Sequence, residues 1–108
     1  MHDIVKKRKN ELAKLCRQLR IKRMYVFGSA SSGQMTAASD IDFLIAFDDS
    51  LSINEYSANY FTLHERLRHL FRREIDVVTE PSLSNPYFIN SINRTKELIY
   101  GTDSEISA

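Results

Sequence analysis

The chain has 108 residues, of which 43% are hydrophobic, and its formal net charge is +1. This length supports one hydrophobic core, so we expect a single domain over residues 1–108. The sequence contains neither an apolar run long enough to span a membrane nor a secretory leader pattern, so we expect a cytoplasmic protein without membrane contact.

The N-terminal segment, residues 1–23, is predicted to be a basic helix, with its helical part from about Asp3 to Leu19. Most of the Lys and Arg residues of the chain lie here. Such a helix either contacts RNA or an acidic partner, or it is the solvated face of an amphipathic helix. No aromatic residues interleave with the basic ones, so the pattern disfavours nucleic-acid binding without excluding it. Cys16 lies on the apolar stripe, which predicts a buried structural thiol.

The next predicted element is a β-strand over Met24–Phe27, which Gly28 ends. Ser29–Gly33 is predicted to be a short helix, and residues 34–39 are predicted to form a loop. Backbone N–H groups point outward at a strand end that opens into a helix or tight turn, and they favour a bound anion. Gly28 and Ser29 are therefore candidate phosphate-binding residues.

A second strand is predicted over Ile41–Phe47, directly after Asp40. Asp40 and Asp42 are two residues apart, so their side chains project to the same side of an extended chain. Two like charges on one side repel each other, and a bound cation relieves that repulsion. Carboxylate oxygens suit Mg²⁺ or Mn²⁺.

The remaining elements complete an alternation of helices and strands. The apolar residues of a long helix recur in steps of four and three: Tyr56, Tyr60, Leu63, Leu67 and Leu70. A third strand over Ile75–Thr79 is halted by Pro81, and Asn85 caps a helix that starts at Pro86.

Leu98–Tyr100 is predicted to be a short strand or a helix end, and residues 102–108 are predicted to fray. Together these elements predict an α/β (α+β) fold, with a small mixed β-sheet flanked by helices.

Two motifs and their spacing resemble a known family. Phe27-Gly28-Ser29 and, ten residues later, Asp40-Ile41-Asp42-Phe43 resemble the signature of the nucleotidyltransferase superfamily that includes DNA polymerase beta and kanamycin nucleotidyltransferase. Glu74-Ile75-Asp76-Val77-Val78 matches the strand that bears the family's third carboxylate. The small size is similar to that of the minimal nucleotidyltransferases, which are encoded beside HEPN-domain proteins in prokaryotic toxin–antitoxin pairs. The resemblance implies a sheet like the palm of polymerase beta.

The resemblance also implies a role for each candidate residue. Asp40, Asp42 and Asp76 would be catalytic and would hold two Mg²⁺ ions, with Mn²⁺ as an alternative. Gly28 and Ser29 would bind the phosphates of a nucleoside triphosphate, ATP. A hydroxyl of the partner HEPN toxin, from a tyrosine, would attack the α-phosphorus and release pyrophosphate. The chain would then be an antitoxin that AMPylates the toxin with which it assembles.

Several alternatives stay open at the level of sequence. Many minimal members carry basic residues after the Gly-Ser pair, where this chain has none in residues 30–33. A non-catalytic subunit that masks its partner is therefore one alternative. A small-molecule transferase of the aminoglycoside type, completed by a helical partner subunit, is another. Arg23, Arg72 and Arg73 are the cations that would compensate for the missing basic residues. Asp76 has the alternative of a salt bridge to Arg72 or Arg73.

Overall fold

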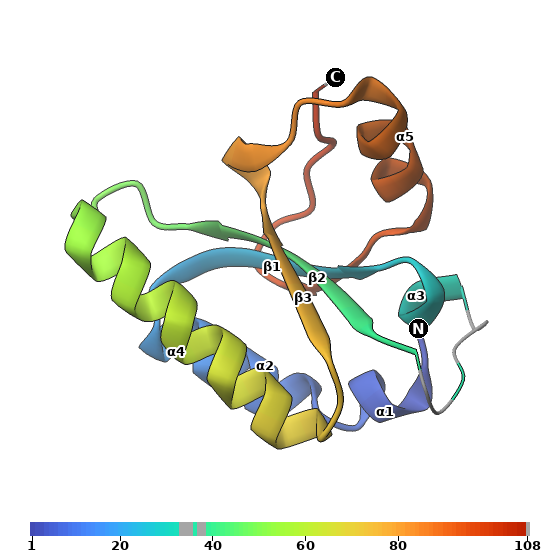
Figure 1. Ribbon diagram of the computed structural model, residues 1–108, viewed down its shortest axis with the longest axis horizontal. Coiled ribbons are helices and arrows are strands. Elements are labelled where there is room, and N and C mark those ends of the chain that lie inside the picture. Colours follow the sequence, from blue (N-terminus) through green and yellow to red (C-terminus); the bar gives the residue numbers. More distant parts are fainter. Residues whose placement is uncertain (33–35, 37–38, 108) are drawn as a thin grey trace.

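The computed structural model describes residues 1–32, 36 and 39–107 (Figure 1). The elements follow one another as α1 (Asp3–Lys6), α2 (Lys9–Gln18), β1 (Ile21–Phe27), α3 (Ser29–Ser32), β2 (Ile41–Phe47), α4 (Ile53–Phe71), β3 (Ile75–Thr79), the 3₁₀ helix η1 (Glu80–Ser82), α5 (Pro86–Thr95) and β4 (Glu97–Tyr100). The end of the predicted short helix, Gly33, and most of the predicted loop 34–39 lie outside the described residues.

The strands form one mixed sheet in the order β3-β2-β1-β4. β1 is antiparallel to β2 and to β4, whereas β2 and β3 are parallel. A parallel pair needs a long crossover, and α4 supplies it between β2 and β3. The expected α+β fold is confirmed. β1 begins at Ile21, three residues before the predicted start, and Ile21 is buried.

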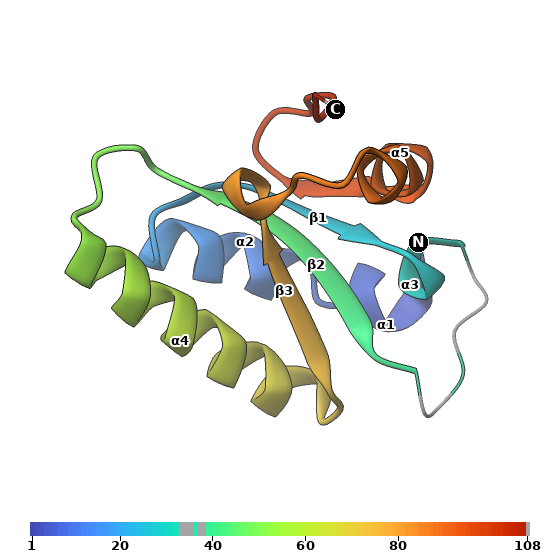
Figure 2. The same ribbon diagram turned by 45° about the horizontal axis from the view of Figure 1, so that its top comes forward.

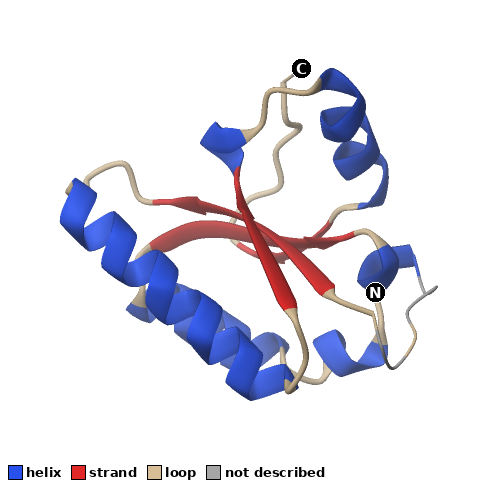
Figure 3. Cartoon of the chain, viewed as in Figure 1, coloured by secondary structure: helices blue, strands red, loops and turns tan. Residues whose placement is uncertain are grey.

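Helices cover both faces of this sheet (Figures 2 and 3). α1, α2 and α4 lie on one face, where alternate strand residues such as Phe43 and Ile45 point into the larger core. α5 lies on the other face, above a smaller cluster of Tyr25, Phe27, Leu44 and Ile92. Because side chains alternate along a strand, Asp42, two residues from Leu44, shares the α5 face.

The predicted single N-terminal helix is wrong, because the structure has two helices there. Arg8 leaves the helical region (φ −106°, ψ 8°) between α1 and α2. The His2 side chain caps α1, and the His2 backbone N–H donates to Ala30 O at 2.7 Å. This anchor, together with burial of Val5, fixes the direction of α1 separately from that of α2. Tertiary contacts therefore override the continuous helical pattern.

Other predictions for the helices are confirmed. Cys16 is buried in α2, and burial raises the pKa of its thiol to about 12. A capping box of Ser52 and Glu55, which was not predicted, starts α4. Asn85 accepts hydrogen bonds at the start of α5, where Pro86 is the first residue. No helix in the described part of the chain combines the length and apolar character needed to cross a lipid bilayer.

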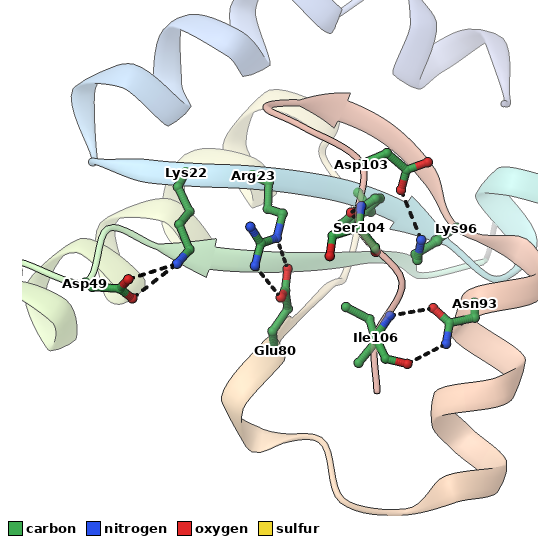
Figure 4. A network of polar contacts seen from close by, with 10 residues as sticks. Lys22, Arg23, Asp49, Glu80, Asn93, Lys96, Asp103, Ser104 and Ile106 are labelled. Carbon is green, nitrogen blue, oxygen red and sulfur yellow. Dashed lines mark hydrogen bonds and ion pairs between the residues drawn. The ribbon is translucent and has the colours of Figure 1, made fainter. Parts of the chain in front are cut away.

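The segment after Gly101 is predicted to fray, yet the structure shows it bound across the α5 face (Figure 4). Asn93 Nδ2 donates to Ile106 O at 2.8 Å, and Ile106 N donates to Asn93 Oδ1 at 3.0 Å. Ser104 N donates to the Tyr25 hydroxyl at 2.7 Å. Ile106 also packs against the smaller cluster. Polar composition suggested fraying, but these side-chain-to-backbone hydrogen bonds offset the entropy of ordering the segment.

Candidate active site

The predicted phosphate turn and the first carboxylate strand meet at the end of β1. Phe27 is the cross-strand partner of Asp42, and Gly28 follows it with φ +70°. A β-carbon built on Gly28 would stand 2.8 Å from Asp42 Oδ2. Glycine is required here for two reasons: an L side chain is strained at this φ, and the carboxylate occupies the space that a side chain would need.

Two carboxylates, Asp42 and Asp76, come from the parallel strands β2 and β3. Asp42 and Asp76 are direct partners in their register, so their side chains stand on the same face. Burial of Asp42, a hydrogen bond that its protonated form makes to Asp76, and the negative charges of Asp76 and Asp40 raise the pKa of Asp42 to about 6. Two carboxyl groups in contact favour sharing a proton when no cation is present.

Asp40 lies apart from this pair. It precedes β2 and is exposed, and it acts on Asp42 through its charge. Within residues 1–32, 36 and 39–107, no three His, Cys, Asp or Glu side chains are arranged so that they could hold a metal ion. The structure thus brings Asp42 and Asp76 into contact and leaves Asp40 at the edge of the predicted site.

The Gly-Ser turn is held by the end of α5. Gly28 N donates to Thr95 Oγ1 at 3.2 Å. Thr95 Oγ1 in turn donates to Ser91 O at 3.1 Å. The Ser31 hydroxyl contacts Thr95 O and Glu97 Oε1, the latter at 2.8 Å. The backbone N–H of Gly28, expected to face a phosphate, is therefore engaged by a side chain.

Thr95 is a residue that sequence reasoning missed. It lies 67 positions after Gly28 and belongs to no recognisable local motif. A helix-terminal threonine is ordinary in sequence, and only the antiparallel pairing of β4 with β1 brings α5 back to the turn. No signal within a short window of the sequence would have indicated it.

Two of the arginines that were predicted to compensate for the missing basic residues, Arg23 and Arg73, form hydrogen bonds within the protein. Arg23 pairs with Glu80 through two hydrogen bonds of 2.6 and 2.8 Å (Figure 4). Arg73 Nη1 donates to Thr36 O at 3.2 Å and to Ser39 O at 3.1 Å, so it contacts the segment that leads into Asp40.

The alternative predicted for Asp76 is a salt bridge to Arg72 or Arg73. In the part of the chain that the structure describes, neither Arg72 nor Arg73 forms an ion pair with Asp76. Arg72 instead ends α4 in the left-handed conformation, with φ 53°. Asp76 therefore has Asp42 as its structural partner.

Comparison with known proteins identifies a family that matches most of this chain. The family described as "Polymerase beta, Nucleotidyltransferase" matches residues 10–105. A protein of Methanocaldococcus jannaschii, named as a candidate protein adenylyltransferase, is 35% identical over 83 residues, which cover 75% of this chain and 77% of that protein.

Two solved structures share the fold. A chain of a toxin–antitoxin crystal structure with AMP-PNP has a TM-score of 0.68 and 25% identity, over 87% of this chain and 73% of that chain. A chain of the complex between a tri-AMPylated Shewanella oneidensis HEPN toxin and its MNT antitoxin has a TM-score of 0.63 and 22% identity, over 90% of this chain and 72% of that chain.

Proposed function

Because this chain belongs to the polymerase beta family of nucleotidyltransferases, we propose that it transfers AMP from ATP to a hydroxyl group of a partner toxin and so acts as an antitoxin. The observation that carries the proposal is the contact of Gly28 with Asp42, because it joins the phosphate turn to the paired carboxylates. The relative named as a candidate adenylyltransferase and the toxin–antitoxin structure with AMP-PNP support the same reaction class. A HEPN protein is the proposed partner, by likeness to the MNT complex.

Divalent magnesium is the proposed cofactor. The register of β2 and β3 sets Asp42 beside Asp76, and burial of Asp42, together with its contact to Asp76, raises the pKa of Asp42 to about 6. Carboxylate oxygens are ligands that suit Mg²⁺. Asp42 and Asp76 would hold the ions, with Asp40 as the proposed third ligand from the edge of the site. When bound, such ions would neutralise charge on the phosphate oxygens.

Phosphate binding and proton transfer are assigned to residues of the chain. In the proposal, the turn at Gly28 and Ser29 binds the phosphates of the nucleotide. The exposed carboxylate of Asp76 accepts the proton of the attacking hydroxyl, in our proposal a tyrosine hydroxyl. A bond then forms between that oxygen and the α-phosphorus, while the bond from the α-phosphorus to the bridging oxygen breaks. The electron pair leaves with pyrophosphate.

A second function, non-catalytic masking of the partner, is favoured by two observations at the turn. The Gly-Ser pair is followed by Ala30, which is fully buried and carries no charge, and Thr95 engages the Gly28 N–H. Both features weaken the electrostatic attraction of the turn for a triphosphate.

Intact mass of the co-purified partner distinguishes the two functions. After incubation with ATP and Mg²⁺, we expect the partner to gain one or more adenylyl units with the wild-type chain and none with Asp42→Ala. Asp49→Asn is the control, because that exposed carboxylate pairs with Lys22 and lies outside the site. Unmodified but neutralised partner with all three chains would support masking and contradict catalysis.

A further inference from the structure

An exposed aromatic ring stands beside the candidate site at the start of α5. Phe88 keeps 42% of its surface exposed, although it is a large apolar residue. Its ring packs edge-on against Phe27, with the ring centroids 6.0 Å apart and an interplanar angle of 70°. The buried part of Phe88 therefore fixes the ring, and the remaining part faces solvent.

Phe27 connects this ring to the carboxylates. Phe27 and Asp42 are direct cross-strand partners, so their side chains neighbour each other on one face of the sheet. Phe27 also immediately precedes Gly28 of the phosphate turn. Phe88, Phe27 and Asp42 thus form a continuous row from an open apolar surface to the site of the proposed reaction.

The same helix is fixed to the turn at its other end. Thr95, the last residue of α5, accepts the Gly28 N–H at 3.2 Å. α5 therefore spans from the phosphate turn to the exposed ring, and the position of Phe88 relative to the turn is set by one rigid element.

We propose that Phe88 supports the nucleobase of the bound nucleotide, an inference that rests on the proposed function. Every base has an apolar π-face, and an aromatic side chain that is already packed in place loses little conformational entropy when a base stacks on it. The chain has no basic residue at positions 30–33 to attract the triphosphate. Contact with the base then supplies affinity that charge does not.

Tyr87, the neighbour of Phe88 on α5, is 85% exposed, but the ring that packs against Phe27 is that of Phe88. Two further exposed apolar side chains lie on another helix. Ile53 and Phe61 are 86% and 68% exposed, and both belong to α4, which covers the opposite face of the sheet. Phe61 is accordingly a matched control: it is an exposed phenylalanine on a helix, far from the carboxylate face.

The test compares ATP, which carries a base, with inorganic tripolyphosphate, which does not. Calorimetric titration in the presence of Mg²⁺ measures the Kd of ATP and of inorganic tripolyphosphate for the full chain. Phe88→Leu keeps apolar contact with Phe27 but removes the ring. We expect it to weaken ATP binding by on the order of tenfold and to leave tripolyphosphate binding unchanged. Phe88→Tyr restores ATP binding, and Phe61→Leu changes neither Kd.

The possible failures can be told apart. Equal ATP affinity of Phe88→Leu and wild type overturns the inference and leaves the proposed function standing. Equal weakening of both ligands also overturns it, because the ring would then support only the turn. Loss of the toxin complex with unchanged ATP affinity would make Phe88 a partner contact. A folded wild-type chain that binds neither ligand overturns the proposed function itself.

Discussion

Asp42 Oδ2 lies beside Gly28, so close that a β-carbon on Gly28 would stand 2.8 Å away. This relationship joins the phosphate turn to the carboxylate pair, because Gly28 cannot gain a side chain without moving the Asp42 carboxylate.

Gly28→Ala should destabilise the fold and abolish transfer. The left-handed φ of +70° costs about 1–2 kcal/mol for an L side chain, and the new methyl group displaces the Asp42 carboxylate. Denaturant unfolding of a double-mutant cycle measures the second part. In an Asp42→Ala background only the backbone strain remains, so Gly28→Ala should cost less there. Equal costs in both backgrounds would show that the contact is energetically neutral.

Asp42→Asn should stabilise the protein while it removes activity. The folded-state pKa of Asp42, about 6, lies above its usual 3.8. The stabilising contribution of the protonated carboxyl group is therefore complete below the lower value and is lost as pH rises through the higher one. Discounted for solvent screening, the variant should gain roughly 1 kcal/mol, or about 4–8 °C in Tm, at neutral pH.

Thermal melts without divalent metal, at about pH 4 and about pH 7.5, check this expectation. The Tm difference between Asp42→Asn and wild type should grow as pH rises across that interval. Asp49→Asn, a change at an exposed carboxylate, is the control and should show no such growth. A constant difference would mean that Asp42 titrates normally.

Thr95→Val should loosen the phosphate turn. The valine keeps the volume but cannot accept the Gly28 N–H, so we expect a loss of about 1 kcal/mol and faster hydrogen exchange of the Gly28 amide. Thr95→Ser retains the hydroxyl and should restore slow exchange. Fast exchange in wild type as well would mean that the hydrogen bond does not persist in solution.

Asn93→Ala should release the C-terminal segment. The variant loses both hydrogen bonds to the backbone of Ile106, so the Ile106 amide should exchange markedly faster and stability should fall by about 1–2 kcal/mol. Asn90→Ala, an exposed position on the same helix, should alter neither quantity. Unchanged exchange at Ile106 in Asn93→Ala would show that packing alone holds the segment.

Local patterns predict the strands and most helices of this fold. The bounds of β2 and β3 agree with the sequence because alternating or continuous apolar runs end there at Asp48 and Pro81. The side chains of Asp40 and Asp42 were predicted to share one side, yet the pairing of Asp42 with Asp76 depends on the β2–β3 register, which a single sequence does not display.

Features made by distant residues were missed. The break at Arg8 depends on how the end of a helix packs. The binding of Ile106 to Asn93 and the contact of Thr95 with Gly28 join residues that are separated in the chain. Propensity and periodicity describe neighbours along the chain, so such contacts leave no local signal. Assignment of catalytic and metal-binding roles to the three aspartates remains a prediction.

The pairing of β4 with β1 sets a time order for the site during protein synthesis. Every predicted site residue, from Gly28 to Asp76, is made before the first residue of β4. Until residues 95–100 emerge, β1 lacks its neighbour on one side and the Gly28 N–H lacks its Thr95 acceptor. A nascent chain therefore carries all three carboxylates before it has a supported turn, so the site matures only when synthesis has passed Tyr100.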